Sequence, residues 1–295
     1  MIDYRYHALS LAAVLFALAL GVLIGVAIGD TNLVSSAKSG IVHNLNAEVG
    51  EARKQADSLQ DRLSEQEAFS RGLYPLAVHE LLNGRAIGLV FLGGSSDEVN
   101  GLVRSTVTQA GGSLATVVAV REPLDLAGIA RAAAGTHYAG VAESNQVLER
   151  FGEIAGHQLV SGGALVNREL LSRTRAPLLS AFDGQLTRLE GLVVARARPA
   201  DMSPAEEQAG EAFEQGLLSG VGAAGVPAVG VELKGSEPSQ VPWYKGRGIS
   251  SVDDLDTLAG RAALAFALAG NRGTFGMKAT ADSLLPALGT GAGQP

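Results

Sequence analysis

Residues 86–120, AIGLVFLGGSSDEVNGLVRSTVTQAGGSLATVVAV, decide the fold of this chain. Residues 86–92 and 113–120 are apolar runs with the length of buried strands. Between them, residues 96–109 have the pattern of a helix, and Gly111 with Gly112 ends it. A strand, a helix and a second strand in this order predict two parallel strands joined by a crossover helix.

The same alternation continues toward the C-terminus. Further helices are predicted at residues 126–134, 144–159, 203–219 and 256–269, and further strands at residues 191–196, 227–232 and 249–252. The helix after Ser203 has a capping residue and a proline, Pro204, at its first position. The fold class is therefore α/β, with a mostly parallel sheet covered on both faces, in one domain of residues 75–288. Residues 289–295 are expected to be a disordered tail.

An uncharged segment of 21 residues, 8–28, lies near the N-terminus and contains one polar residue, Ser10. As a helix it is about 31 Å long, which matches a hydrocarbon core of about 30 Å. Residues 1–32 are predicted to be a single-pass anchor in the cell membrane. Arg5 before the segment favours a cytoplasmic N-terminus and an extracytoplasmic globular domain. The alternative is a cleaved signal peptide ending near residues 27–29, although the apolar run is longer than such peptides usually have.

Small residues recur at every fourth position of this segment and form one ridge of the predicted helix. They are Ala13, Ala17, Gly21, Gly25 and Gly29. Such a ridge lets two helix backbones approach closely, which predicts a helix–helix interface in the membrane. The alternative is that glycine and alanine are simply frequent in membrane helices.

Residues 33–74 are predicted to be a coiled-coil stalk, because apolar residues follow a heptad spacing over more than three repeats. The interface positions are Val42, Leu45, Val49, Ala52, Ala56, Leu59 and Leu63. Charges at the flanking positions attract across a parallel pair: Glu48 faces Arg53, and Arg62 faces Glu67. Because both copies leave the same membrane face, we expect a parallel homodimer or higher oligomer. The alternative is one amphipathic helix packed on its own domain, since alanines weaken the seam.

The stalk is predicted to stop at Gly72 and Pro75. Pro75 then suits the first turn of a short helix that runs through Leu82 and is ended by Gly84.

Composition excludes several kinds of protein. The 295 residues include 23 Lys+Arg, 30 Asp+Glu and no cysteine, and the net charge is −7. The acidic balance argues against a nucleic-acid binder, and the absence of cysteine excludes disulfides, thiolate metal sites and cysteine nucleophiles. The motifs of nucleophile elbows and P-loops are absent, so the chain is predicted to be no enzyme and to need no cofactor. Histidines have no local partner at metal-ligand spacing; they are His7, His43, His79, His137 and His157.

Three stretches are candidate sites. Residues 93–96 (GGSS) follow the first strand and open a helix, which is the position of a phosphate-binding loop in nucleotide-binding folds. Arg121 and Glu122 follow the next strand, near the position of a ribose-binding residue in such folds. The alternative is an ordinary turn in which Ser95 and Glu98 form a capping box. Asp253, Asp254 and Asp256 could hold a hard cation, or Asp254 or Asp256 caps the following helix and Arg261 pairs with them. Residues 243–245 (WYK) are predicted to lie in a loop, as an exposed contact site or as an anchor packed on the domain.

Several motifs together resemble the MctB-type copper transport family of actinobacteria. They are RYHALSLAAV at residues 5–14, ALGV at residues 19–22, SSVDDLDT at residues 250–257 and FGMK at residues 275–278. The second signature includes Asp253, Asp254, Asp256 and Thr257, followed by Gly260 and Arg261. The resemblance implies an anchor, a coiled coil and a Rossmann-like domain, and a role at the cell envelope in limiting intracellular copper. Related proteins also resemble envelope components whose coiled coil works with a cell-division partner such as a cell-wall hydrolase.

Overall fold

The computed structural model describes residues 4–29, 31–162 and 168–287, and it divides into two units, Met1–Ala68 and Phe69–Pro295. The first unit contains α1 (Tyr4–Ile28) and most of α2 (Thr31–Val78). Within the described residues, α1 alone is long and apolar enough to cross a membrane, with a candidate span of Tyr6–Ile28. Helices α1 and α2 are separate, and α2 begins at Thr31, two residues before the predicted start of the stalk.

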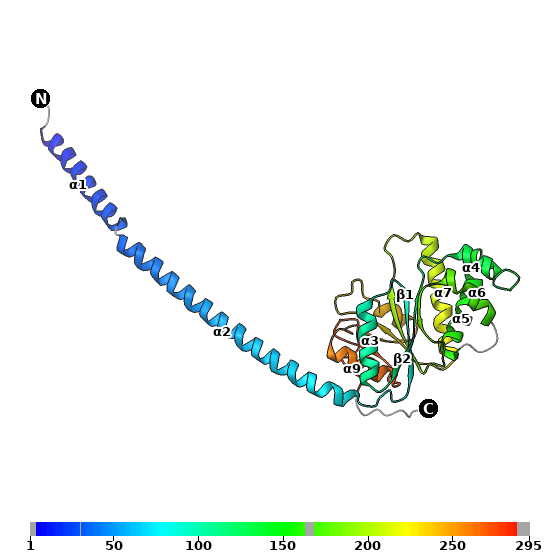
Figure 1. The fold of residues 1–295 in the computed structure, drawn as a ribbon. Helices are drawn as coiled ribbons and strands as arrows, with labels where there is room; N and C mark the ends of the chain where they lie inside the picture. The colour runs from blue at the N-terminus through cyan, green and yellow to red at the C-terminus, as the bar shows by residue number, and fades with distance from the viewer. Residues whose placement is uncertain (1–3, 30, 163–167, 288–295) are drawn as a thin grey trace. The chain divides into compact units, whose positions relative to one another are not determined.

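The second unit is built around a seven-stranded sheet in the order β3-β2-β1-β4-β5-β6-β7 (Figure 1). The strands are β1 (Ala86–Gly93), β2 (Ser113–Val120), β3 (Leu179–Gly184), β4 (Gly191–Ala197), β5 (Ala228–Val231), β6 (Ser250–Val252) and β7 (Thr274–Phe275). Every neighbouring pair is parallel except β2 with β3, so the predicted mostly parallel sheet is confirmed. From β1 the strand order proceeds outward in one direction through β2 and in the other through β4, and sheets of this kind open a crevice at their carboxyl edge between the two strands where the order reverses, here β1 and β4.

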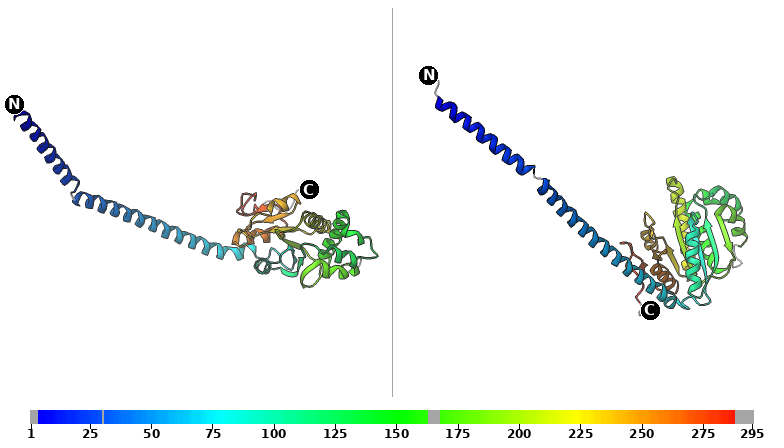
Figure 2. Two further views of the ribbon diagram at one scale, coloured as in Figure 1. Left: turned by 90° about the horizontal axis from the view of Figure 1, so that it is seen from above. Right: turned by 60° about the vertical axis from the view of Figure 1, so that its left-hand side comes forward.

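Helices cover both faces of the sheet, as predicted (Figures 1 and 2). One face packs against α3 (Asp97–Gln109), α9 (Leu258–Leu268) and the end of α2. The other face packs against α4 (Leu126–Ala132), α5 (Asn145–Ser161), α6 (Arg168–Leu178), α7 (Pro204–Ala223) and α8 (Val241–Gly246), with a short 3-10 turn at Ala139–Ala142. Each face therefore has its own apolar core.

The predicted end of the stalk is wrong. Helix α2 continues through Gly72 and Pro75 to Val78, and no separate helix runs through Leu82. Proline lacks a backbone N–H and so removes one helical hydrogen bond. The cost in stability is small in the last turn of a helix that tertiary contacts hold in place. Those contacts come from Tyr74 and Val78, which are both buried in the core under α3 and α9.

Five elements of the second unit were not predicted from the sequence: α6, β3, α8, β7 and the 3-10 turn at Ala139–Ala142. The α6 sequence is polar and contains Pro177, while β3 is an edge strand whose side chains are largely exposed. Strand β7 has two residues, too few for any periodic pattern. The tail at residues 289–295 lies outside the described residues.

Helices α5 and α7 approach each other through glycines. A Cβ atom at Gly152 or Gly156 would run into the backbone of α7, and one at Gly216 or Gly220 would run into the backbone of α5. Both helices thus carry a pair of glycines four residues apart at their contact, and these are four of the 38 glycines of the chain. Close packing of the two backbones fixes α7, and α7 carries Glu211 and Glu214 of the site described next.

Candidate functional site

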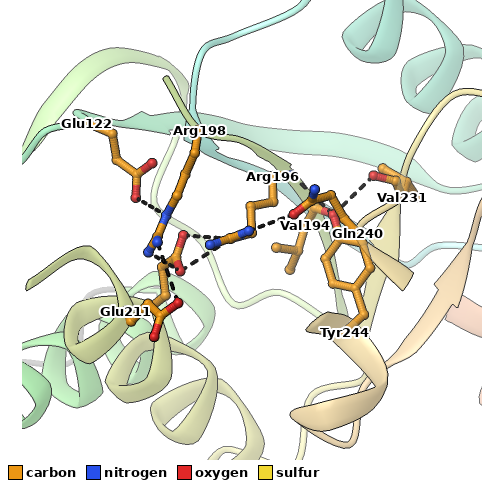
Figure 3. Close-up of polar contacts among 9 residues, drawn as sticks. Glu122, Val194, Arg196, Arg198, Glu211, Val231, Gln240 and Tyr244 are labelled. Atoms are coloured by element: carbon orange, nitrogen blue, oxygen red, sulfur yellow. Dashed lines mark hydrogen bonds and ion pairs between the residues drawn. The ribbon is translucent and has the colours of Figure 1, made fainter. Parts of the chain in front are cut away.

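A buried cluster of charged residues lies at the carboxyl edge of the parallel strands (Figure 3). Glu122 follows β2, Arg196 is the last residue but one of β4, and Arg198 comes directly after that strand. Glu211 and Glu214 project from α7. The side chain of Glu214 is 1% exposed and that of Glu122 is 2% exposed, whereas that of Glu211 is 55% exposed. Charged side chains this deeply buried are found almost only when they are paired.

Glu214 is the centre of the cluster. Arg196 Nε donates to Glu214 Oε1 at 3.1 Å, and Arg198 Nη2 donates to Glu214 Oε2 at 2.8 Å. Arg198 Nε also lies 3.4 Å from Glu122 Oε1, and its Nη1 lies 3.6 Å from Glu211 Oε1. Two arginines thus share three carboxylates, and each arginine contacts Glu214.

The electrostatics of this cluster are uneven. The pKa of Glu122 is raised to about 7: burial contributes most to this rise, the nearby Glu214 carboxylate adds to it, and Arg198 and Arg196 oppose it. Glu122 therefore exchanges a proton near neutral pH, unlike an ordinary glutamate. A carboxyl group of this kind is capable of proton transfer, but a structural ion network perturbs a pKa in the same way.

Helix α8 closes the cluster on the other side. Arg196 Nη1 donates to Gln240 Oε1 at 2.6 Å, and the Arg196 backbone N–H donates to the Tyr244 hydroxyl at 3.1 Å. That hydroxyl also lies 3.2 Å from the carbonyl oxygens of Val194 and Val231, so Tyr244 ties β4 to β5 (Figure 3). Burial raises the pKa of Tyr244, so it stays a neutral donor.

The expected loop at residues 243–245 is wrong, because these residues lie in α8. Of the two interpretations offered for them, packing on the domain fits Tyr244, which is fully buried. Trp243 is half-buried, and the guanidinium groups of Arg196 and Arg247 lie 4.5 and 3.9 Å from its ring centre. These are cation–π contacts.

The glycine loop at residues 93–96 is joined to β4. Gly94 N–H donates to the Ala197 carbonyl at 3.0 Å, and Gly93 has a φ of +98°. A Cβ at Gly93 would run into that same carbonyl oxygen, so only glycine fits. The loop thus has the close backbone approach that a turn between β1 and α3 requires.

The capping residue of α3 differs from the expectation. Ser96, rather than Ser95, accepts from the Val99 backbone N–H, at 3.3 Å. The helix therefore starts one residue later than the capping-box spacing indicated. Arg121 follows β2 on the exposed side, while Glu122 turns into the buried cluster.

A second buried group lies at the ends of β5 and β6. Glu232 accepts from Ser239 Oγ at 2.8 Å and from Lys278 Nζ at 2.7 Å, and it also accepts from the Gln240 backbone N–H. Asp253 accepts from the backbone N–H groups of Met277 at 2.8 Å and Lys278 at 3.1 Å. Two buried carboxylates therefore hold the turn that follows β7.

The three aspartates after β6 bind three different partners, and neither Asp254 nor Asp256 caps α9. Thr257 is the cap, and its hydroxyl accepts from the Gly260 N–H at 2.9 Å. Asp254 accepts from the Thr257 hydroxyl at 2.9 Å, and burial raises its pKa. Asp256 accepts from the Lys234 backbone N–H at 2.7 Å.

The expected pairing of Arg261 with these aspartates is also not found, since no ion pair joins them within the described residues. Burial raises the pKa of Tyr74, near the end of α2, and the charge of Arg261 opposes this rise. In the described part of the chain, no three His, Asp or Glu side chains are grouped as metal ligands.

Comparison with known proteins identifies the family. The family described as "Copper transport outer membrane protein, MctB" matches residues 1–286. Proteins named "Copper transporter MctB" from Mycobacterium bovis (strain ATCC BAA-935 / AF2122/97) and Mycobacterium tuberculosis (strain ATCC 25618 / H37Rv) are 32% identical over 122 residues.

The chain belongs to the MctB family. Each alignment with these two relatives covers 41% of this chain and only 38% of the relative, well under half of either protein.

The structure gives the quoted motifs of this MctB-family chain a physical role. The signature at residues 250–257 contains β6 and Thr257, the residue that caps α9. Its Asp253 accepts hydrogen bonds from the backbone of residues 277–278. The closing motif at residues 275–278 supplies Lys278, whose ammonium group also donates to the Ser236 carbonyl at 2.6 Å. The two C-terminal motifs therefore bind each other.

The predicted membrane and stalk interfaces remain predictions, because they concern a second copy of the chain. Ala13, Ala17, Gly21 and Gly25 lie on α1, and Gly29 follows its last residue, with its N–H donating to the Gly25 carbonyl at 2.8 Å. The side chain of Val42 lies outside the described residues, and the other stalk positions lie on α2, where Leu45, Leu59 and Leu63 are exposed.

Proposed function

We propose that this MctB-family chain is a membrane-anchored envelope protein that limits the amount of copper inside the cell. The observation that carries the proposal is the family match over residues 1–286, which runs from the anchor to the closing motif. The mycobacterial relatives are named copper transporters, and α1 supplies a segment long enough to cross a bilayer. In this proposal α1 crosses the cell membrane once, with the N-terminus in the cytoplasm and the second unit outside it.

Deletion of the gene in its native host tests this proposal. Cell-associated copper, measured by elemental mass spectrometry, is expected to rise, and growth is expected to stop at a lower copper concentration. The full chain supplied in trans should restore both values, whereas residues 31–295 without α1 should not. Unchanged copper content in the deletion strain contradicts the proposal.

A second candidate is a non-enzymatic scaffold that recruits or activates an envelope or cell-division partner such as a cell-wall hydrolase. It is favoured by α2, a continuous helix of 48 residues whose apolar seam positions are open to solvent. Leu45, Leu59 and Leu63 are 58, 59 and 54% exposed. An apolar stripe with complementary flanking charges fits a parallel second copy of the same helix.

Paired lysine substitutions test the scaffold. Leu45→Lys with Leu59→Lys should convert a dimer to a monomer, as measured by light scattering of the full chain in amphipol, and should abolish capture of envelope proteins. Ala47→Lys with Ser58→Lys adds the same charge at outward heptad positions and should change neither property. Equal mass and equal capture in both variants contradict the scaffold.

A further inference from the structure

A cavity of about 340 Å³ opens between the β2–β3 end of the sheet and helices α5, α6 and α7. This volume lies in the range of about 300–1,000 Å³ that is typical of small-molecule sites, whereas protein cores ordinarily leave few voids larger than a water molecule. The described lining is mostly apolar and comprises Val118, Val120, Ala155, Gln158, Leu159, Leu171, Ser172, Arg175, Leu178, Leu179, Phe182, Leu186, Phe213 and Leu217.

One positive charge lies at this cavity. Arg175 is the only charged side chain of the described lining, and it is exposed on α6. Its guanidinium carbon lies 3.8 Å from the centre of the Phe182 ring, which holds the cation over the apolar wall. Within the described residues Arg175 forms no ion pair, so its charge is available to a ligand.

Ser172 gives the same rim a second polar group. It is exposed, lies three residues before Arg175 on α6, and therefore shares a helix face with it. Leu186, also exposed, extends the apolar wall to the surface. The rim thus combines a cation and a hydroxyl, and the described lining behind them is apolar except for the buried Gln158.

We infer that this cavity binds a fatty acid, with the acyl chain inside the apolar wall and the carboxylate paired with Arg175 at the rim. An apolar ligand without an acid would make no use of the guanidinium at the rim, and a small anion would leave the apolar wall unfilled. A carboxylate and a guanidinium form a charge-assisted, two-point contact that no neutral head group provides. Proteins of a membrane-protein family lie close to lipids, which are a source of acyl chains.

Photolabelling of the full chain tests this inference. The protein in amphipol is incubated with a tetradecanoic acid that carries a diazirine near its methyl end, irradiated, and digested for mass spectrometry. Labelled peptides are expected from α5, from α6 and from β3. Arg175→Glu should reduce this labelling about tenfold, because it removes the paired cation and places a carboxylate beside the carboxylate of the ligand. Ser172→Trp, which narrows the rim without entering the core, should reduce it as well.

Arg173→Glu is the matched control, since Arg173 is an exposed arginine of α6 outside the lining, and it should label as the wild type does. Unlabelled tetradecanoate should compete about tenfold better than tetradecanol, because only the acid can pair with Arg175. Equal labelling of Arg175→Glu and wild type overturns the inference. Labelling confined to α1, or equal competition by the alcohol, overturns it too.

Discussion

Arg198 donates a 2.8 Å hydrogen bond to Glu214, and this pair joins the carboxyl end of β4 to the middle of α7. Arg196, two residues earlier, donates to the other oxygen of the same carboxylate. In extended chain, side chains two residues apart lie on the same side, so Arg196 in β4 and Arg198 just after it both reach one acid. Glu214 therefore bridges two largely buried arginines, and Arg198 also pairs with Glu122 and Glu211.

Glu214→Gln is expected to destabilise the domain by about 3–5 kcal/mol, because it leaves buried arginines without their main counter-charge. Urea unfolding of the full chain in amphipol, followed by tryptophan fluorescence, measures this change. Glu211→Gln is the control, since Glu211 is half-exposed and its pair with Arg198 should contribute about 1 kcal/mol or less. If both variants lose the same free energy of unfolding, the buried pair does not stabilise the domain more than the exposed pair does.

Glu122 is expected to make stability depend on pH. Its pKa is about 7 in the folded chain because of burial and of Glu214, against about 4.3 in an unfolded chain. The folded state therefore holds a proton that the unfolded state has lost, and the free energy of unfolding falls as the pH rises from about 4.5 to 7. The total fall is on the order of 3 kcal/mol.

Thermal melting at pH 5 and pH 8 measures this dependence. Glu122→Gln, which stays neutral, should match the wild type at pH 5 and melt at a higher temperature at pH 8. Glu143→Gln, at an exposed glutamate, should follow the wild type at both values. If the melting temperatures of the wild type and of Glu122→Gln change in the same way between pH 5 and pH 8, Glu122 does not cause the pH dependence.

Local patterns allowed much of the sheet to be predicted. Strands β1 and β2 were bounded to within one residue, since apolar runs and paired glycines mark their ends. The start of α7 was also confirmed: Ser203 caps it, with Pro204 in its first turn. These features depend on residues that are near one another in the sequence.

The buried ion cluster could not be predicted in the same way, because Glu122, Arg196 and Glu214 meet only after the strands are aligned. One signal was available: charged residues directly follow predicted strands, as Glu122 and Asp253 do, and the carboxyl ends of parallel strands meet at one edge. Glu214 gave a weaker signal, as an acid beside the apolar Phe213 in a predicted helix. The stalk interface remains a prediction, because its contacts would be made with another copy of the chain.

Gly216→Ala is expected to destabilise the chain by about 1–3 kcal/mol, because the added methyl group would push α7 away from the Glu149 carbonyl of α5. Gly222→Ala is the control, because it adds the same methyl group to the same helix. Nothing lies within 4 Å of a Cβ at Gly222, so alanine there should stabilise the helix by up to about 1 kcal/mol. Urea unfolding measures both, and shifts of the same sign would contradict close backbone packing of α5 and α7.

Asp253→Asn is expected to loosen the closing motif while leaving the sheet in place. The buried Asp253 carboxylate accepts from two backbone N–H groups, at Met277 and Lys278, and an amide offers one acceptor oxygen in place of two. The loss should be about 1–3 kcal/mol. Hydrogen exchange should accelerate at the amides of residues 276–279 and remain unchanged in β1. Asp201→Asn, at an exposed aspartate, should alter neither region. If exchange accelerates equally in β1, Asp253 stabilises the whole domain rather than this turn.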